Sequence, residues 1–111
     1  MAGRSQARTS GLSMAGERSV SWSDEARVQV GDIKEYIRRQ WSDREVEVFL
    51  DLLQEFESLV IRYPNGYARS ELFKGCRRAV IHPNVSVVYK VNAVEIEVVT
   101  VYDNRSRRSF H

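Results

Sequence analysis

The strongest constraint on the fold of this chain is a change in the spacing of its apolar residues near residue 72. Between residues 24 and 62, apolar side chains recur at intervals of three and four, which is typical of amphipathic helices. Beyond residue 72, valines and isoleucines alternate with polar residues, which is typical of strands. A chain of 111 residues with both patterns is expected to fold as one α+β domain, in which helices cover one face of a sheet.

Two helices are expected in the first half. The first begins after Ser23, a suitable N-cap before the acidic residues of the first turn, and its buried face ends at Trp41. A serine–glutamate capping box at residues 42–45 starts the second helix, and the short junction predicts a helical hairpin. Gly31 lowers the helix propensity of the first helix by about 1 kcal/mol relative to alanine, so we expect it to pack closely against the second helix.

Four strands are expected, one before the helices and three after them. Their predicted ranges are 20–22, 76–81, 85–91 and 94–102. The short turns between the last three strands predict antiparallel hairpins. In the last strand, every second residue from Val94 to Tyr102 is expected to face the helices. The predicted order is therefore β-α-α-β-β-β, an antiparallel four-stranded sheet packed on an α-helical hairpin.

Charge is divided unevenly along the chain. Residues 23–63 carry six basic and ten acidic side chains, a net charge of −4, whereas residues 64–111 carry eight basic and four acidic ones, a net charge of +4. The basic half could bind phosphates or an acidic partner. Residues 1–17 are rich in glycine, serine, alanine and arginine. We expect a flexible tail, an expression tag or an alternative start there, with a nucleic-acid-binding arm as the remaining alternative, and a single domain over residues 18–111.

Cysteine content and hydropathy favour a cytoplasmic location. The single cysteine, Cys76, cannot close a disulfide within the chain, which is consistent with a reducing compartment. There is no run of about 18 apolar residues for a membrane-spanning helix, and no apolar segment typical of a secretory signal. We therefore expect no membrane partner, and neither a metal nor a cofactor.

Three stretches follow one another in the order known from one protein family. They are residues 20–26 (VSWSDEA), residues 75–78 (GCRR), and residues 87–91 (VVYKV) leading to residues 101–105 (VYDNR). Together they resemble the RelE/ParE superfamily of toxins from type II toxin–antitoxin systems, and the last is similar to the ending of its plasmid-stabilisation branch. The resemblance covers residues 18 to about 106. It implies a cytosolic bacterial toxin that forms a hetero-oligomer with its cognate antitoxin.

Some members of this superfamily cut messenger RNA on the ribosome, and others act on DNA gyrase. Metal-independent RNA cleavage needs a base, an acid and positive charge at the phosphate. By resemblance, Arg77 and Arg105 are candidate catalytic residues, and Lys74, Arg78 and Lys90 are candidate phosphate-binding residues. A plain surface role is the alternative for each of them. Strand alternation lets only one of Arg77 and Arg78 face a ligand, and Arg77 matches the arginine of the relatives by position.

Three further side chains are candidates for proton transfer or base stacking. His82 is a candidate general base because histidine exchanges protons near neutral pH, but its place in a turn favours a solvated residue. Tyr89 is expected in the core rather than stacked on a base, and Tyr102 either in the core or close to Arg105. RNA-cutting relatives carry a histidine or tyrosine, which serves as the acid, after the last arginine. Here residues 106–110 contain neither, and the only histidine beyond Arg105 is the terminal His111, so the acid position has no matching residue.

The sequence therefore leaves three functions open. The first expectation is a ribosome-dependent mRNA endonuclease (an mRNA interferase). The alternatives are a non-enzymatic, ParE-like inhibitor of DNA gyrase and a degenerate toxin that keeps only antitoxin binding. In the first two cases the antitoxin is expected to cover the basic face of the sheet with an acidic segment.

Overall fold

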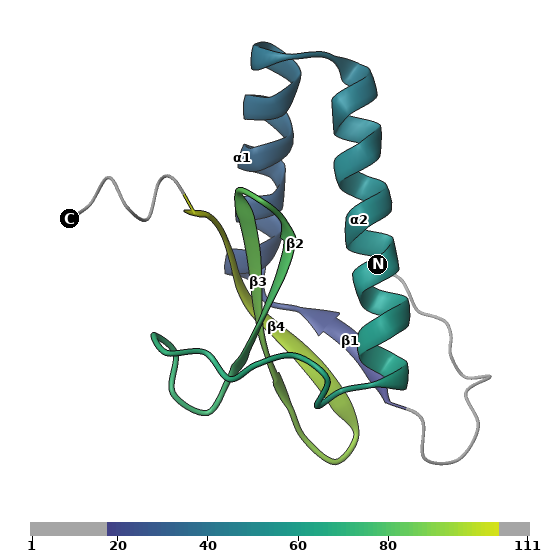
Figure 1. The fold of residues 1–111 in the computed structure, drawn as a ribbon, viewed down its shortest axis with the longest axis vertical. Helices are drawn as coiled ribbons and strands as arrows, with labels where there is room; N and C mark the ends of the chain where they lie inside the picture. The colour runs from purple at the N-terminus through teal and green to yellow at the C-terminus, as the bar shows by residue number, and fades with distance from the viewer. Residues whose placement is uncertain (1–17, 105–111) are drawn as a thin grey trace.

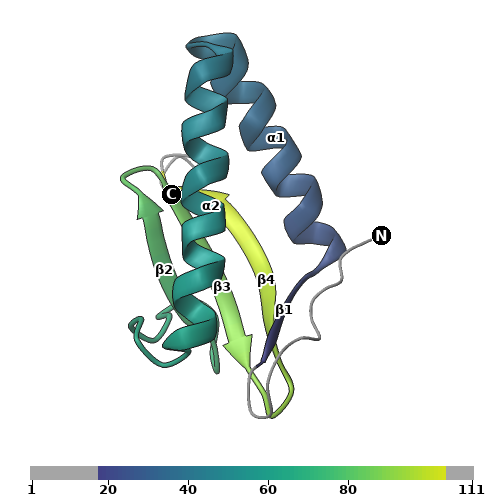
Figure 2. The same ribbon diagram turned by 90° about the vertical axis from the view of Figure 1, so that its right-hand side faces the viewer.

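The structure, a computed structural model, describes residues 18–104 and confirms the predicted order of elements (Figure 1). The elements are β1 (Ser19–Trp22), α1 (Asp24–Gln40), α2 (Asp43–Arg62), β2 (Arg77–His82), β3 (Val85–Val91) and β4 (Glu95–Asp103). The two helices form a hairpin that covers one face of a four-stranded sheet, so the α+β class is confirmed (Figure 2). The expected tail, residues 1–17, and Arg105 lie outside the described residues.

The sheet is mixed, with the strand order β1-β4-β3-β2. The pairs β2–β3 and β3–β4 are antiparallel, as the short turns predict. β1, however, runs parallel to β4, with Val20 opposite Ile96, so the expectation of a wholly antiparallel sheet is wrong. Two helices and two strands separate β1 from β4 in sequence, and a connection of that length allows a parallel neighbour.

Both helices begin where the sequence predicts. The hydroxyl of Ser23 accepts a hydrogen bond from the backbone N–H of Ala26 at 2.9 Å, and the hydroxyl of Ser42 accepts one from the N–H of Glu45 at 3.3 Å. Each serine therefore satisfies an N–H group that has no partner within the helix. Among the described helices, none is long and apolar enough to cross a membrane.

Two expectations for α1 are wrong. Trp41 was expected on the buried face, but its side chain is 56% exposed and its ring lies 6.0 Å from that of Tyr36. The reason is that the tip of the hairpin extends beyond the end of the sheet, which leaves the last turn without a cover (Figure 2). Gly31 was expected to pack closely, but a Cβ atom at this exposed position would meet nothing within 4 Å.

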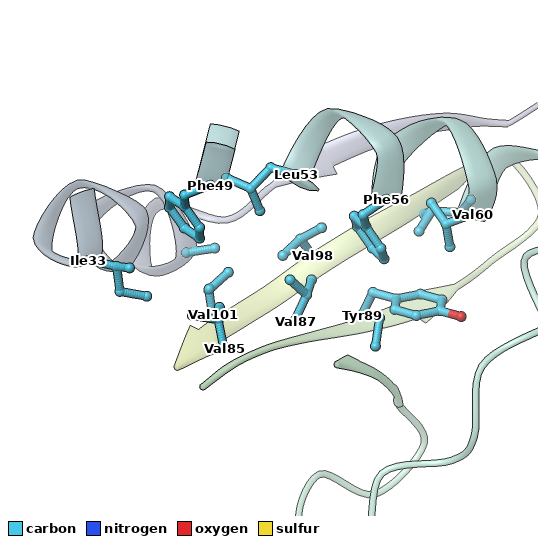
Figure 3. Packing of buried hydrophobic residues seen from close by; sticks show 13 residues of the cluster. Ile33, Phe49, Leu53, Phe56, Val60, Val85, Val87, Tyr89, Val98 and Val101 are labelled. Atoms are coloured by element: carbon cyan, nitrogen blue, oxygen red, sulfur yellow. The ribbon is translucent and has the colours of Figure 1, made fainter. Parts of the chain in front are cut away.

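The core lies between the helical hairpin and the sheet (Figure 3). Phe56 of α2 lies at its centre, with its ring 5.7 Å from that of Tyr89 on β3 and 6.5 Å from that of Trp22 on β1. The indole N–H of Trp22 also donates a hydrogen bond to the carboxylate of Glu57 at 2.6 Å. Helix α2 is therefore fixed to both an edge strand and an inner strand of the sheet.

A β-bulge at Val99 corrects the predicted face of β4. Tyr89 pairs with Val98, but Val88 pairs with Thr100, so Val99 is an extra residue in β4. An extra residue reverses the alternation of side chains beyond it. Val98 and Val101 therefore both face the core, whereas Tyr102, expected beside Val98, lies on the opposite side. The hydroxyl of Thr100 still reaches α1, where it donates a hydrogen bond to the side-chain oxygen of Gln29 at 2.9 Å.

Candidate functional site

Four basic side chains line a cavity at the end of the sheet where β2 begins, and we call this cavity the basic groove. It encloses about 450 Å³ between the loop after α2 and the ends of β2 and β3. The four side chains are those of Arg69, Lys74, Arg77 and Lys90. Such a concentration of positive charge, with arginine forks among the donors, suits phosphate groups or the carboxylates of a partner protein.

The loop that forms one wall of the groove is folded back on itself. The hydroxyl of Ser70 accepts hydrogen bonds from the N–H groups of Leu72 and Phe73, at 3.2 and 2.9 Å. The N–H of Ser70 donates to the carbonyl of Cys76 at 2.8 Å. Gly75 adopts a φ of +80°, a conformation that side-chain-bearing residues avoid, and so permits the sharp turn before β2.

Arg77 lies on the helix-facing side of β2, opposite Tyr89. Its guanidinium donates a hydrogen bond to the backbone carbonyl of Tyr67 at 2.7 Å and also lines the basic groove. Arg69, to which no sequence pattern points, lies beside it through an isolated antiparallel bridge. The loop around Arg69 has no strand-like alternation, so local sequence gave no sign of this pairing.

Lys90 and Arg78 lie on the other, open side of the sheet. The ammonium nitrogen of Lys90 is 3.6 Å from the carboxylate of Glu97, and an ion pair this exposed adds little stability. Arg78 donates from Nε to the hydroxyl of Ser86 at 2.9 Å, and that hydroxyl donates to the Oδ1 atom of Asn104 at 2.8 Å. Of the two neighbouring arginines, Arg78 is thus the one on the open face, and Arg77 is the one in the groove.

Tyr89 is a core residue, in agreement with the strand pattern. Its side chain is fully buried, and its hydroxyl donates a hydrogen bond to the carbonyl of Pro64 at 2.8 Å. Burial raises the pKa of Tyr89 to about 12, because the phenolate would lose its hydration. The hydroxyl is therefore neutral and already has an acceptor at physiological pH.

His82 lies at the opposite end of β2 from Arg77. The five residue steps between them correspond to about 16 Å at roughly 3.3 Å per residue. The Nδ1 atom of His82 accepts a hydrogen bond from the backbone N–H of Asn84 at 3.1 Å, which is a turn-stabilising contact. One phosphate cannot contact His82 and Arg77 together across that distance.

Tyr102 lies at the end of β4, on the side opposite the core. It is half-buried and its ring centre is 6.5 Å from that of Phe73, with the two planes tilted by 32°. Its expected neighbour Arg105 falls outside the described residues. The structure therefore gathers Lys74, Arg77 and Lys90 in one groove and leaves Arg78, His82 and Tyr102 elsewhere. Within residues 18–104, no group of acidic, histidine or cysteine side chains could hold a metal ion.

A second cavity, which no sequence motif predicts, lies under the tip of the helical hairpin, and we call it the hairpin-tip cavity. It encloses about 240 Å³. Its walls include Ile37, Trp41 and Val48 from the helices, together with His82 and Asp103 from the strand ends. The signal that could have revealed it is Trp41 itself, because a tryptophan at the last turn of a helix has little sheet to cover it.

Comparison with known proteins identifies a matching family and solved structures with a similar fold. Residues 20–108 match the family described as "ParE toxin of type II toxin-antitoxin system, parDE". The chain resembles a solved chromosomal ParDE toxin–antitoxin system from P. aeruginosa, with a TM-score of 0.70 and 15% identity over 80% of this chain and 98% of that one. It also resembles YafQ from E. coli, with a TM-score of 0.56 and 14% identity over 82% of this chain and 98% of that one. None of the curated protein sequences matches this chain.

Proposed function

Because the chain belongs to the ParE toxin family of type II toxin–antitoxin systems, we propose that it arrests bacterial growth by binding DNA gyrase rather than by cutting RNA. The observation that carries this proposal is the separation of the candidate catalytic groups. His82 lies about 16 Å from Arg77 along β2, and the hydroxyl of Tyr89 is buried against the carbonyl of Pro64. The basic groove is thus equipped to bind an anion, whereas His82 and Tyr102 lie away from it and the hydroxyl of Tyr89, although next to Arg77, is buried with an acceptor of its own.

An inhibitor of this kind needs an extended charged surface instead of an acid and a base. Arg69 and Lys74 are exposed beside the groove, and Arg77 is fixed within it by the carbonyl of Tyr67. Fixed positive charge binds an acidic protein surface or the phosphates of DNA held by an enzyme, and its long-range attraction also speeds association. We assign this surface to contacts with gyrase in the cytosol, and to the antitoxin when the toxin is neutralised.

The antitoxin is proposed to form a hetero-oligomer with the chain and to cover the basic groove with an acidic segment. Support comes from the family and from the similar E. coli structure described as the DinJ-YafQ toxin–antitoxin complex, which has a TM-score of 0.54 and 14% identity over 81% of this chain and 96% of that one. An antitoxin that occupies the groove would exclude the target by direct competition. A role in plasmid stabilisation follows if the pair is carried on a plasmid.

A supercoiling assay with purified gyrase tests the main proposal. We expect the wild-type chain to inhibit supercoiling, and the variant Lys74→Glu to inhibit less, whereas Lys34→Glu on α1 should behave like the wild type. Unchanged supercoiling at an excess of the chain would exclude the gyrase proposal. Induction in cells, alone and with the neighbouring reading frame, tests the toxin class separately, because arrest relieved by the neighbour requires a toxin–antitoxin pair.

A ribosome-dependent mRNA endonuclease is the second candidate. It is favoured by Arg77 and Lys90, which line the same groove from opposite sides of the sheet and could neutralise a scissile phosphate bound there. Cleavage of message in a purified translation system, with supercoiling unaffected, would support it. A chain that does neither and leaves growth unaffected without its antitoxin would be a degenerate toxin.

A further inference from the structure

We propose that the hairpin-tip cavity is a second docking site for the antitoxin, and that it takes an apolar side chain next to a basic one. This inference rests on the antitoxin partnership proposed above. The cavity lies at the end of β2 that carries His82, whereas the basic groove lies at the end that carries Arg77. The two sites are therefore separated by about 16 Å along the strand.

The interior of the cavity is apolar and accessible. Ile33, Ile37 and Phe49 contribute to its floor, while Trp41 and Val48 stand at its opening with 56% and 44% of their surfaces exposed. Apolar side chains that are exposed together around a cavity, rather than singly, are typical of a binding site. The volume of about 240 Å³ is below the roughly 300–1,000 Å³ of pockets for drug-sized ligands, so a single anchoring side chain is the better fit.

The rim of the cavity is acidic. The carboxylates of Glu45, in the first turn of α2, and Asp103, at the end of β4, both line it. Asp103 already takes part in an interaction within the chain, so the carboxylate of Glu45 is the one that complements a lysine or arginine adjacent to the anchoring residue. Exposed ion pairs contribute little affinity, so the charges would act mainly by rejecting an acidic neighbour of the anchor.

The opposite charges of the two sites give the antitoxin a defined direction. An acidic stretch suits the basic groove, and a basic residue with an apolar neighbour suits the hairpin-tip cavity. An extended segment crosses about 16 Å with five residue steps, so one short segment could reach both sites. If the segment bound in the reverse direction, like charges would face each other at both ends.

The experiment measures the binding of two synthetic peptides by the fluorescence of Trp41. Both peptides are acetylated and amidated and carry one leucine, flanked by two arginines in the first and by two glutamates in the second. We expect the wild-type chain to bind the arginine peptide about three- to tenfold more tightly, from the usual range for exposed ion pairs. Replacing Trp41 by phenylalanine should abolish the signal, which shows that it does not come from Trp22.

Matched variants separate the rim from the floor. Glu45→Gln should reduce the preference for the arginine peptide by about two- to fivefold, whereas Glu47→Gln, two residues away and outside the cavity, should leave it unchanged. Val48→Ser should weaken the binding of both peptides. Val28 is an exposed valine on α1 outside the cavity, so Val28→Ser should leave the binding of both unchanged.

Three results would overturn the inference. They are equal binding of the two peptides by the wild type, an equal effect of Glu45→Gln and Glu47→Gln, and a signal that persists without Trp41. A fourth result would assign the cavity to residues 105–111 of the same chain. This result is a change in Trp41 fluorescence on deletion of those residues that matches the change seen when a bound peptide is removed. Because none of these measurements involves gyrase, their failure leaves the supercoiling result intact.

Discussion

The guanidinium of Arg77 donates a hydrogen bond to the backbone carbonyl of Tyr67 at 2.7 Å, and so joins the first residue of β2 to the loop that follows α2. The ring of Tyr67 packs in turn against Phe56 and Tyr89, with centres 6.0 and 6.1 Å apart. The same arginine therefore supports the wall of the basic groove and supplies part of its charge.

Replacing Arg77 by methionine should lower the free energy of unfolding by about 1–2 kcal/mol, because the carbonyl of Tyr67 loses its donor while the apolar stem is retained. Arg69→Met is the matched control, since Arg69 is an exposed arginine of the same groove, and should change stability by less than about 0.5 kcal/mol. Urea unfolding at neutral pH measures both. Equal losses in the free energy of unfolding would show that the hydrogen bond from Arg77 to the carbonyl of Tyr67 adds no stability beyond that of an exposed arginine.

Stability should also fall at alkaline pH because of Tyr89. Burial raises its pKa to about 12, whereas an unfolded tyrosine ionises near pH 10. Its contribution is therefore fully present below pH 10 and is lost as pH rises from about 10 to about 12. Tyr89→Phe should flatten this part of the pH profile and should cost about 1 kcal/mol at neutral pH, where the carbonyl of Pro64 loses its donor.

Unfolding titrations between pH 8 and pH 11.5 would test the assignment. Burial also raises the pKa of Tyr67, so some alkaline loss should remain in the Tyr89→Phe variant. A profile for that variant as steep as the wild-type profile would mean that the loss arises elsewhere.

Gly31 offers a stabilising substitution. It lies inside α1, where glycine costs about 0.5–1 kcal/mol relative to alanine, and a Cβ atom there meets nothing within 4 Å. Gly31→Ala should therefore raise the free energy of unfolding by about that amount. Gly75→Ala is the opposite case, because its φ of +80° strains any residue with a side chain, and it should lower stability by about 1–2 kcal/mol. Thermal unfolding distinguishes the two, and a destabilised Gly31→Ala variant would contradict the expectation.

Local chemistry made much of the fold predictable. Ser23 and Ser42 cap the two helices as expected, because an N-cap depends only on residues within one turn. The parallel pairing of β1 with β4 could not be read in the same way. The partner of a strand depends on packing across the whole domain, and the predicted strand 20–22 carries no mark of direction.

The site was less predictable than the fold. The bulge at Val99 inverts the faces of β4 beyond Val98, and no glycine or proline marks it in the sequence. Arg69 reaches the basic groove through a bridge from an irregular loop, and Trp41 lines a cavity because the helical hairpin is longer than the sheet that it covers. Each of these depends on the relative lengths and registers of elements far apart in sequence.

Charge reversal in the basic groove should weaken the complex with the antitoxin. Lys74 is exposed at the groove, and Lys74→Glu would place a carboxylate opposite the acidic segment proposed to bind there. We expect the dissociation constant to rise about tenfold, which corresponds to roughly 1.4 kcal/mol, and the effect to shrink as salt screens the charges. Lys34→Glu on α1 makes the same change of net charge away from the groove and should raise it by less than about twofold. Titration calorimetry of the purified pair at two salt concentrations measures both, and equal effects of the two substitutions would move the antitoxin to another face.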